Sequence, residues 1–245
     1  MTEAKPKIRL FVDAPLGIGS ELSLERDKAH YLFGVMRLEI GANVAVFNGR
    51  DGEWAAEVVE AGKRGGRLIC QRQSAEQRNP PDLWLLFAPI KKARTDFIVE
   101  KAAELGAARI QPVFTTFTNS ERVRPDRLRA HAVEAAEQCG GTFVPEVAEP
   151  TRLDKLLAEW PNERRLLFCD ESQSGVNILP ALREASTGSW AILIGPEGGF
   201  SPDERRVQQE MKNTLPVTLG PRILRADTAA VAALSLWQAT LGDWG

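Results

Sequence analysis

The chain has 245 residues, of which 43% are hydrophobic and 26% charged, a composition typical of one large or two smaller globular domains. It contains no apolar run near the roughly 20 residues that span a bilayer, and no apolar segment follows its N-terminal charges, so we expect a cytoplasmic protein without a membrane partner. Three isolated cysteines and two histidines argue against a disulfide framework and a metal site, and the net charge of −2 argues mildly against a nucleic-acid partner.

The first 75 residues predict a small, β-rich, barrel-like module. The Asn48-Gly49 turn between two extended runs is typical of a β-hairpin. A helix is expected over 25–35, where apolar side chains can share one face. Residues 73–82 are polar and end in a proline pair, which indicates a linker, so we place the domains at 1–75 and 83–245. The predicted strands cover 8–12, 43–47, 53–59 and 67–70.

From residue 83 onward, strands alternate with helices. The predicted strands cover 83–88, 109–113, 165–170, 191–194 and 216–219. The predicted helices cover 95–105, 125–138, 178–185, 202–212 and 228–241. This alternation indicates an α/β fold around a mostly parallel sheet. Ligands of such sheets bind beyond the carboxyl ends of the strands, so the turns that follow the strands are candidate sites.

The strongest local feature is the turn Gly195–Gly199, between a strand that ends at Ile194 and a helix. Ser201 and Glu204 are spaced for a capping box at the start of that helix. Glycines let a ligand approach the backbone closely. The turn matches neither the phosphate-binding P-loop nor the dinucleotide fingerprint, so it does not predict a phosphate cradle. A tight structural turn without a ligand is an equally good interpretation.

A second glycine-bearing strand end follows at Leu219-Gly220, with Ile223 and Leu224 placed between Arg222 and Arg225. Two such strand ends close together in the sequence predict one composite pocket. In the alternative interpretation, the two apolar residues belong to the core and the two arginines are solvated.

A third feature is a basic block at the start of the 95–105 helix. Together with cations of the first module, it is a candidate phosphate-binding surface. A solvated helix start is the alternative for this block. The candidate RNA-binding residues are Arg9, His30, Arg37, Lys91, Lys92, Arg94 and Lys101.

Taken in this order, the segments resemble the RsmE family of 16S ribosomal RNA uridine-N3 methyltransferases, in the SPOUT superfamily. The resemblance covers nearly the whole chain. Its most specific motifs are the blocks Ile194–Phe200 and Leu219–Ala229. Further matching residues are Arg9-Leu10-Phe11, His30 with Met36-Arg37, Phe47-Asn48-Gly49, Lys91-Lys92, Lys101–Gly106 with Ile110-Gln111-Pro112, and Glu137–Gly140 with Pro145.

This resemblance implies an N-terminal PUA-like β-barrel and a C-terminal SPOUT α/β domain with a deep trefoil knot, a rare exception to the rule against threaded chains. It also implies a homodimer that uses S-adenosylmethionine, with 16S ribosomal RNA or the small ribosomal subunit as its partner. The cofactor-binding residues that it implies are Ile194, Gly195, Pro196, Glu197, Gly198, Gly199, Leu219, Gly220, Arg222, Ile223 and Leu224.

Three residues are candidates for catalysis of this reaction. Glu197 is a candidate base for the N3 proton, although it could instead only shape its loop. Arg225 is a candidate for stabilising negative charge on the uracil carbonyls, and Thr228 for orienting the uridine. Because N3 lies on the Watson–Crick edge, the uridine must be unpaired or flipped out.

The chain departs from the family pattern at Gly141 and Asn119, where an arginine is expected in many members. Arg122 or Arg124 is a candidate replacement for the arginine expected at Asn119, and Asp227 stands where glutamate is commoner. Three other functions stay open. They are methylation of another RNA or of a ribose oxygen, non-catalytic ribosome assembly, and small-molecule chemistry in a nucleotide pocket.

Overall fold

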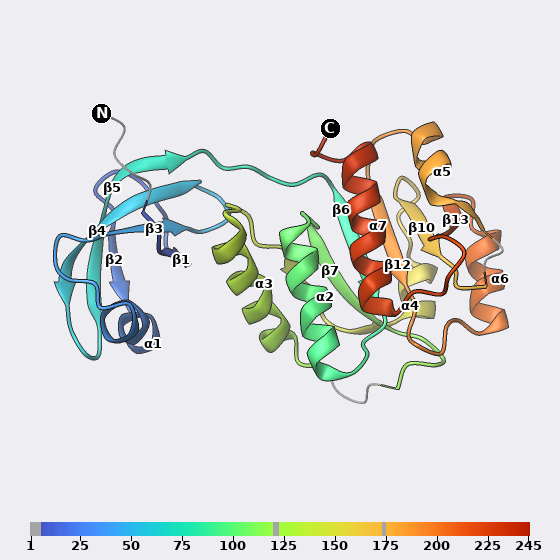
Figure 1. The fold of residues 1–245 in the computed structure, drawn as a ribbon, viewed down its shortest axis with the longest axis horizontal. Helices are drawn as coiled ribbons and strands as arrows, with labels where there is room; N and C mark the ends of the chain where they lie inside the picture. Colours follow the sequence, from blue (N-terminus) through green and yellow to red (C-terminus); the bar gives the residue numbers. More distant parts are fainter. Residues whose placement is uncertain (1–5, 120–122, 173–174) are drawn as a thin grey trace. The chain divides into compact units, whose positions relative to one another are not determined.

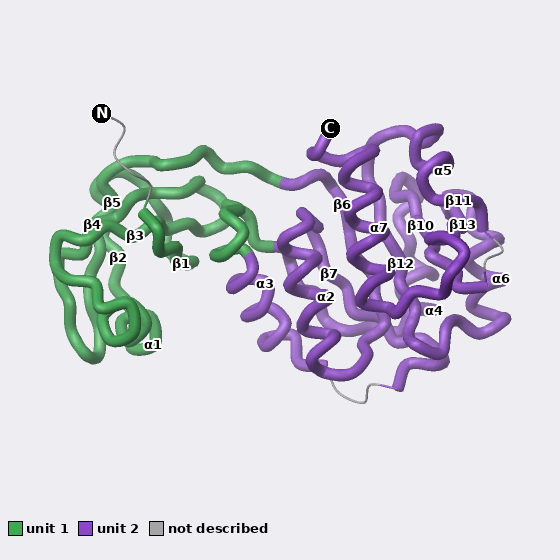
Figure 2. The backbone as a smooth tube through the Cα atoms, in the orientation of Figure 1, with its two compact units in different colours: residues 1–79, 136–144 green, residues 80–135, 145–245 purple. Residues whose placement is uncertain are grey.

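The computed structural model describes residues 6–119, 123–172 and 175–245, which form two compact units. Unit 1 takes the described residues up to Asn79 together with Ala136–Val144 (Figure 2). Unit 2 takes Pro80–Ala135 and Pro145–Gly245. No sequence feature predicted that the segment Ala136–Val144, from the middle of the chain, belongs to unit 1.

Unit 1 contains a five-stranded mixed sheet in the order β1-β3-β4-β5-β2, in which β1 and β3 are parallel and the other neighbours antiparallel (Figure 1). The predicted hairpin is confirmed, because β3 and β4 pair with Phe47 opposite Glu53. Register shifts between β4 and β5 mark bulges, which bend a sheet around its core. The strands are β1 (Arg9–Phe11), β2 (Glu21–Leu24), β3 (Asn43–Phe47), β4 (Glu53–Ala61) and β5 (Gly66–Ala75).

The helix predicted over 25–35 is present as α1 (Arg26–Ala29), which continues as the π-helical segment η1 (His30–Val35). Its buried face inserts Leu32, which is fully buried, into the core of unit 1. Phe33 packs against β5 at Gly66, where the β-carbon of any other residue would overlap the phenyl ring.

Unit 2 is built on a sheet whose neighbouring strands are all parallel, as predicted, in the order β11-β13-β10-β12-β6-β7-β8, with β9 paired to β7. The short strands β8, β9 and β11 were not predicted. The strands are β6 (Leu83–Phe87), β7 (Arg109–Phe114), β8 (Glu146–Val147), β9 (Thr151–Arg152), β10 (Arg165–Cys169), β11 (Val176–Asn177), β12 (Trp190–Ile194) and β13 (Thr214–Thr218).

The helices of unit 2 are α2 (Lys92–Glu104), α3 (Pro125–Cys139), α4 (Leu153–Ala158), α5 (Ile178–Glu184), α6 (Pro202–Glu210) and α7 (Ala226–Leu241). The last turn of α3 belongs to unit 1. Helix α7 packs against both α2 and α5 (Figure 1). In the described part of the chain, no helix is long and apolar enough to cross a membrane.

The position of β10 decides where a ligand can bind. This strand pairs in parallel with β12 on one side and β13 on the other, although β13 is the last strand in the chain. The carboxyl ends of all three strands therefore meet at one edge of the sheet. The trefoil knot that the family resemblance implies stays a prediction.

Candidate functional site

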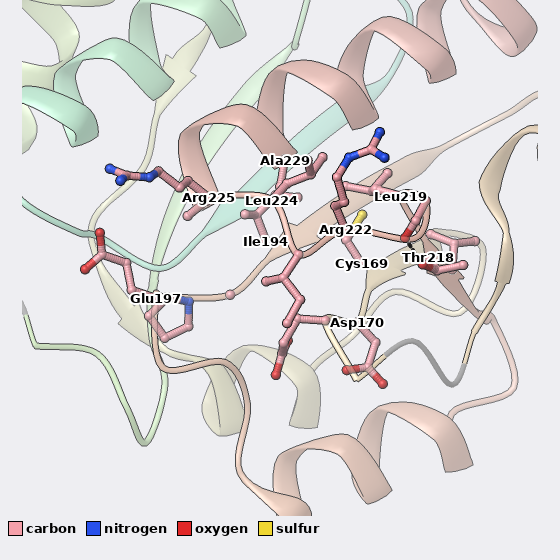
Figure 3. A pocket seen from close by; sticks show the side chains of 17 residues that line it. Cys169, Asp170, Ile194, Glu197, Thr218, Leu219, Arg222, Leu224, Arg225 and Ala229 are labelled. Atoms are coloured by element: carbon pink, nitrogen blue, oxygen red, sulfur yellow. Dashed lines mark hydrogen bonds between the residues drawn. The ribbon is translucent and has the colours of Figure 1, made fainter.

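The two glycine-bearing turns lie together at the carboxyl edge of the sheet of unit 2. They follow β12 and β13, the two neighbours of β10, and enclose with the end of β10 a cavity of about 330 Å³ (Figure 3). This is the geometry that a composite pocket requires. The lining residues are Cys169, Asp170, Glu171, Ile194, Gly195, Pro196, Glu197, Val217, Thr218, Leu219, Gly220, Arg222, Ile223, Leu224, Arg225, Ala226 and Ala229.

Three of the candidate residues, Gly198, Gly199 and Thr228, are not among the residues that line the cavity, and their predicted roles stay predictions. A β-carbon on Gly198 would lie 3.2 Å from Cβ of Phe117, and Gly199 adopts a φ of 69° against the carboxylate of Glu171, so both glycines shape the turn. The exposed Thr228 lies in the first turn of α7, and its amide nitrogen donates to the carboxylate of the preceding residue at 2.8 Å.

The structure adds lining residues that the sequence interpretation missed. Asp170 and Glu171 directly follow β10, and Val217 and Thr218 end β13. A signal for the first pair was available, since a strand was expected over 165–170 and ligands of parallel sheets bind beyond strand ends. Thr218 donates its hydroxyl hydrogen to the carbonyl oxygen of Gly220 at 3.1 Å and so supports the second turn (Figure 3).

A carboxylate–arginine cluster holds the first turn in place. Arg205 of α6 donates from Nε to Asp170 at 3.2 Å and also bonds Glu171, which in turn accepts the amide of Phe200 at 3.2 Å. Burial works against the charged form of Arg205, but the ion pairs with Glu171 and Asp170 outweigh it and raise the pKa of Arg205. The fully buried Phe200 packs edge-on against Phe168, with the ring centroids 5.0 Å apart. The turn between β12 and α6 is therefore anchored from two sides.

The predicted capping box at the start of α6 is confirmed. The amide of Ser201 donates to Glu204 Oε2 at 2.8 Å, and the amide of Glu204 donates to Ser201 Oγ at 3.3 Å. The other carboxylate oxygen of Glu204 accepts the amide of Thr116 at 2.8 Å, which joins the loop after β7 to this helix start.

Arg94, predicted as an RNA contact, lies between the carboxylates of the two pocket segments. Its Nη1 is 3.9 Å from Glu197 Oε1 and 3.6 Å from Asp227 Oδ2. In Figure 3, Arg225 lies on the same side of the cavity as Glu197, while Arg222 lies toward the other side. Two exposed arginines therefore line the cavity, and Arg94 lies next to it between two acids.

Cys169 lines the cavity, and its buried thiol is largely protonated at neutral pH. Burial raises the pKa of its thiol to about 12, so the thiolate is scarce near pH 7. Among the described residues, no group of three or more His, Cys, Asp or Glu side chains is placed to hold a metal ion. Besides the thiol of Cys169 and the hydroxyl of Thr218, the polar groups that line the cavity are carboxylates, arginines and backbone groups.

Arg9, also predicted as an RNA contact, is occupied within unit 1. Only 9% of its side chain is exposed, and its Nε donates to the buried Glu53 at 2.7 Å. Its other nitrogens donate to the carbonyl oxygens of Ala136, Glu137 and Gly141, between 2.6 and 2.8 Å. Arg9 therefore closes the carboxyl end of α3, and we remove it from the candidate RNA surface. Gly141 contributes to this contact through its backbone.

The remaining basic candidates differ in their exposure and in whether an acidic side chain pairs with them. His30 and Arg37 are exposed in unit 1, and Lys91 and Lys92 are exposed at the start of α2 in unit 2, whereas Lys101 pairs with a glutamate of its own helix. Asn119 is exposed, and Arg122 lies outside the described residues. The exposed Arg124 lines a small cavity with Lys92 and Arg127.

Comparison with known proteins first defines the class. Residues 77–238 match the RNA methyltransferase domain family and residues 24–69 match the RNA methyltransferase PUA domain. Fold and pocket are thus those of an RNA methyltransferase with a PUA domain. Ribosomal RNA small subunit methyltransferase E of Rickettsia conorii is 30% identical to this chain, over 93% of each protein. The chain belongs to the ribosomal RNA small subunit methyltransferase E family, as its motifs predicted.

Two solved structures are similar over almost their whole length. One is a methyltransferase from Legionella pneumophila in complex with the cofactor S-adenosylmethionine, with 29% identity, a TM-score of 0.88, and 98% of this chain and 100% of that chain covered. The other is ribosomal RNA small subunit methyltransferase E from Neisseria gonorrhoeae bound to S-adenosylmethionine, with 26% identity, a TM-score of 0.86, and 97% and 99% covered.

Proposed function

We propose that this protein uses S-adenosylmethionine to methylate N3 of a uridine in the 16S ribosomal RNA of the small ribosomal subunit. The observation that carries the proposal is that both glycine-bearing turns line one cavity. The chain that forms this cavity belongs to the ribosomal RNA small subunit methyltransferase E family. Methylation of another RNA and non-catalytic assembly are the outcomes that the experiment below separates.

The cavity fits the cofactor in size and in chemistry. Its volume of about 330 Å³ lies within the usual range of small-molecule pockets. Gly220 has a φ of 110°, and no atom lies within 4 Å of the position a β-carbon would take, so its backbone is open to a ligand. Leu219 and Leu224 offer apolar contacts, and the exposed Arg222 offers a positive charge to the carboxylate of the ligand.

We assign the cofactor to the lining residues of both turns, extended by the residues that follow β10. When bound, S-adenosylmethionine supplies an electrophilic methyl group. The proposed binding residues are Asp170, Glu171, Ile194, Gly195, Pro196, Glu197, Thr218, Leu219, Gly220, Arg222, Ile223 and Leu224. Their task is to hold the reacting atoms in line, because orientation can contribute a large part of the rate.

Arg225 and Glu197 are the residues we assign to the uridine. As N3 loses its proton, negative charge spreads onto the neighbouring carbonyl oxygens, and the exposed guanidinium of Arg225 is placed at the cavity to stabilise it. Glu197 accepts the N3 proton, and Arg94 at 3.9 Å keeps its carboxylate at the rim. Lys91 and Lys92 begin the same helix as Arg94 and bind the RNA backbone near the reacting base.

The test is to incubate the purified protein with labelled S-adenosylmethionine and small subunits that lack the modification, and to map the label by nuclease digestion and mass spectrometry. We expect one labelled uridine in 16S ribosomal RNA, methylated at N3. Label on a ribose oxygen or on another RNA would overturn the assigned substrate. Absence of cofactor binding in calorimetry would favour a non-catalytic assembly factor. Free 16S ribosomal RNA serves as a parallel substrate that shows whether the assembled subunit is required.

A homodimer, a cytoplasmic location and independence from metal ions belong to the same proposal. Size-exclusion chromatography with light scattering checks the first, with twice the 27.0 kDa chain mass expected. Activity should be unchanged by a chelator, since the proposed chemistry uses only side chains, backbone and cofactor.

A further inference from the structure

Arg37 has a backbone conformation that is unfavourable for an arginine. Its φ is 56°, and it is the only residue other than glycine with a positive φ in the described ranges of the chain. In this left-handed region the β-carbon crowds the following carbonyl group, so glycine is the residue usually found there.

The core of unit 1 imposes this conformation. The amide of Met36 donates to the carbonyl oxygen of Tyr31 at 2.9 Å, and the amide of Leu38 donates to that of Leu32 at 3.0 Å. The second bond spans seven residues and turns the chain back at Arg37. Helices commonly end with one residue in the left-handed region, usually glycine. Leu32 is fully buried and Leu38 packs against the same core, so the backbone cannot relax without losing apolar contacts. The fold requires the left-handed turn but does not require the arginine.

The side chain of Arg37 has no partner within the described structure. It is exposed, and no hydrogen bond, ion pair or aromatic ring among the described residues engages its guanidinium. Arg9 shows the contrast, because its guanidinium donates to three carbonyl oxygens and a carboxylate. An arginine that strains the backbone and contacts nothing inside the protein is explained by a ligand outside it.

The segment that precedes Arg37 exposes aromatic and apolar side chains. Tyr31, the one tyrosine of the chain, is 40% exposed, and Val35 and Met36 are 59% and 41% exposed. The imidazole of His30 lies against Gly34, where a β-carbon would come within 2.8 Å of Nδ1. An aromatic ring, a flexible thioether and a guanidinium are thus presented by one helical end.

We propose that the surface formed by His30, Tyr31, Val35, Met36 and Arg37, here named the η1 surface, binds one unpaired nucleotide of the RNA substrate. Arg37 binds the phosphate, and the base stacks on Tyr31 beside Met36. Unpaired bases in RNA are recognised by stacking on aromatic side chains, and guanidinium groups pair with phosphates. The inference rests on the proposed function, because it takes an RNA as the substrate and adds where unit 1 binds it.

The first experiment measures stability and RNA binding of the full chain with Arg37→Gly and Arg37→Ala. The probe is a fluorescently labelled single-stranded RNA of mixed sequence, in a salt titration. Both variants should bind about tenfold more weakly, with the salt slope reduced by about 0.7, because one phosphate contact is lost. Only Arg37→Gly relieves the backbone, so its thermal midpoint should rise by roughly 2–4 °C. Unchanged RNA affinity in Arg37→Gly would overturn the proposal.

The second experiment tests the stacking contact. Tyr31→Ala should weaken binding of the single-stranded probe by about tenfold, whereas Tyr31→Phe should retain most of the affinity because the ring remains. Arg50→Ala is the matched control for the loss of one charge. Arg50 is exposed in the turn after β3, at the opposite end of that strand from the segment that contains Arg37. Equal losses in Arg50→Ala and Arg37→Ala would show a general charge effect and contradict the η1 surface.

Failure of this inference can be told apart from failure of the proposed function. Every variant should bind S-adenosylmethionine as the unmodified protein does, and methyl transfer should show a raised KM for RNA with little change in kcat. If the variants bind and methylate RNA normally, the η1 surface is wrong and the proposed function stands. If the unmodified protein binds RNA but transfers no methyl group, the proposed function fails instead. Loss of binding to a ribosomal protein with unchanged RNA affinity would identify a protein partner and overturn the nucleotide assignment.

Discussion

The two ends of the parallel sheet in unit 2 are built for different tasks. At the amino end, Arg164 is buried at 7% exposure and lies 3.7 Å above the ring of Trp84. It donates to both carboxylate oxygens of Asp82, at 2.8 and 2.9 Å, and to the carbonyl oxygen of Trp190 at 3.0 Å. Trp160 adds an edge-on contact to Trp84. The indole rings of Trp84 and Trp160 and the hydrogen-bonded guanidinium of Arg164 fill this end.

At the carboxyl end, the same strands lead into glycine-bearing turns and a cavity. Its arginines, Arg222 and Arg225, are exposed, and its carboxylates at Asp170 and Glu171 are held by α6. Residues that stabilise the sheet therefore lie at the amino ends of its strands, and residues that can bind or react with a ligand lie at the carboxyl ends. Substitutions at the two ends should therefore affect different measurements.

Arg225→Ala should have the largest effect. We expect kcat to fall by about 10²–10³-fold, because a donor aimed at developing charge is removed. Calorimetry should show unchanged affinity for S-adenosylmethionine, and the thermal midpoint should not move. Arg222→Ala, on the other side of the cavity, is the matched control and should affect cofactor affinity more than kcat. Full turnover in Arg225→Ala would refute the charge-stabilising role.

Arg164→Met probes the opposite end of the sheet. The substitution keeps an apolar stem over Trp84 but removes the charged hydrogen bonds to Asp82 and Trp190. We expect the free energy of unfolding, measured with urea, to fall by about 2–3 kcal/mol. A larger loss is not expected, because the side chain of Asp82 is half exposed and water screens its ion pair with Arg164. Affinity for S-adenosylmethionine, measured below the unfolding transition, should be unchanged. A loss of this affinity together with the loss of stability would show that the two ends of the sheet do not act independently.

Gly195→Ala should act at the carboxyl end alone. A β-carbon there would lie 2.6 Å from Cε2 of the buried Phe200, so either the ring or the turn must shift. Overpacking of this kind costs about 1–2 kcal/mol, and we expect roughly tenfold weaker binding of S-adenosylmethionine. Gly17→Ala, in unit 1, is the control, because its φ is not positive and the atom nearest to its β-carbon position, Ser20 Oγ, lies at 3.6 Å, an ordinary contact distance. Equal cofactor affinity in both variants would show that the turn is not part of the binding site.

Lowering the pH should destabilise the protein at the amino end of the sheet of unit 2, because Asp82 becomes protonated there. Partial burial favours its protonated form, but the hydrogen bonds and charge of Arg164 outweigh this and hold the pKa of Asp82 below its ordinary value of 3.8. A carboxyl group with a lowered pKa contributes stability above that value and loses it as the pH falls through its folded pKa. Asp82→Asn should therefore be less stable than the unmodified protein at pH 7, by about 1 kcal/mol, and the difference should shrink below pH 4. A difference that stays constant down to pH 3 would contradict this linkage.

Cys169→Ala should have the smallest effect on catalysis. The raised pKa of the thiol leaves little thiolate to attack a pyrimidine ring near pH 7. We expect kcat to stay within about twofold of the unmodified protein, although the lost side chain lowers stability. Loss of activity that follows thiolate titration in a pH profile would show covalent catalysis instead.

The sequence by itself determined the local structure and the family. Two extended runs around the Asn48-Gly49 turn predicted the hairpin of unit 1. Continuous apolar runs specified the buried parallel strands, since a strand covered on both faces has no polar side. The capping box at Ser201 and the glycines near 195 and 220 marked where strands end and a pocket could begin. These signals are local, so one sequence is enough to detect them.

Only the tertiary structure decided which distant groups meet. Arg9 is separated by 127 residues from the carbonyl of Ala136 that accepts its hydrogen bond, and Arg94 reaches carboxylates on two separate segments of the pocket. The two-residue strands β8 and β11 exist because neighbouring strands supply partners for their backbone groups. A basic residue has the same appearance in a sequence whether its charge is buried in a network or exposed. Its role therefore depends on long-range contacts that periodicity and spacing do not encode.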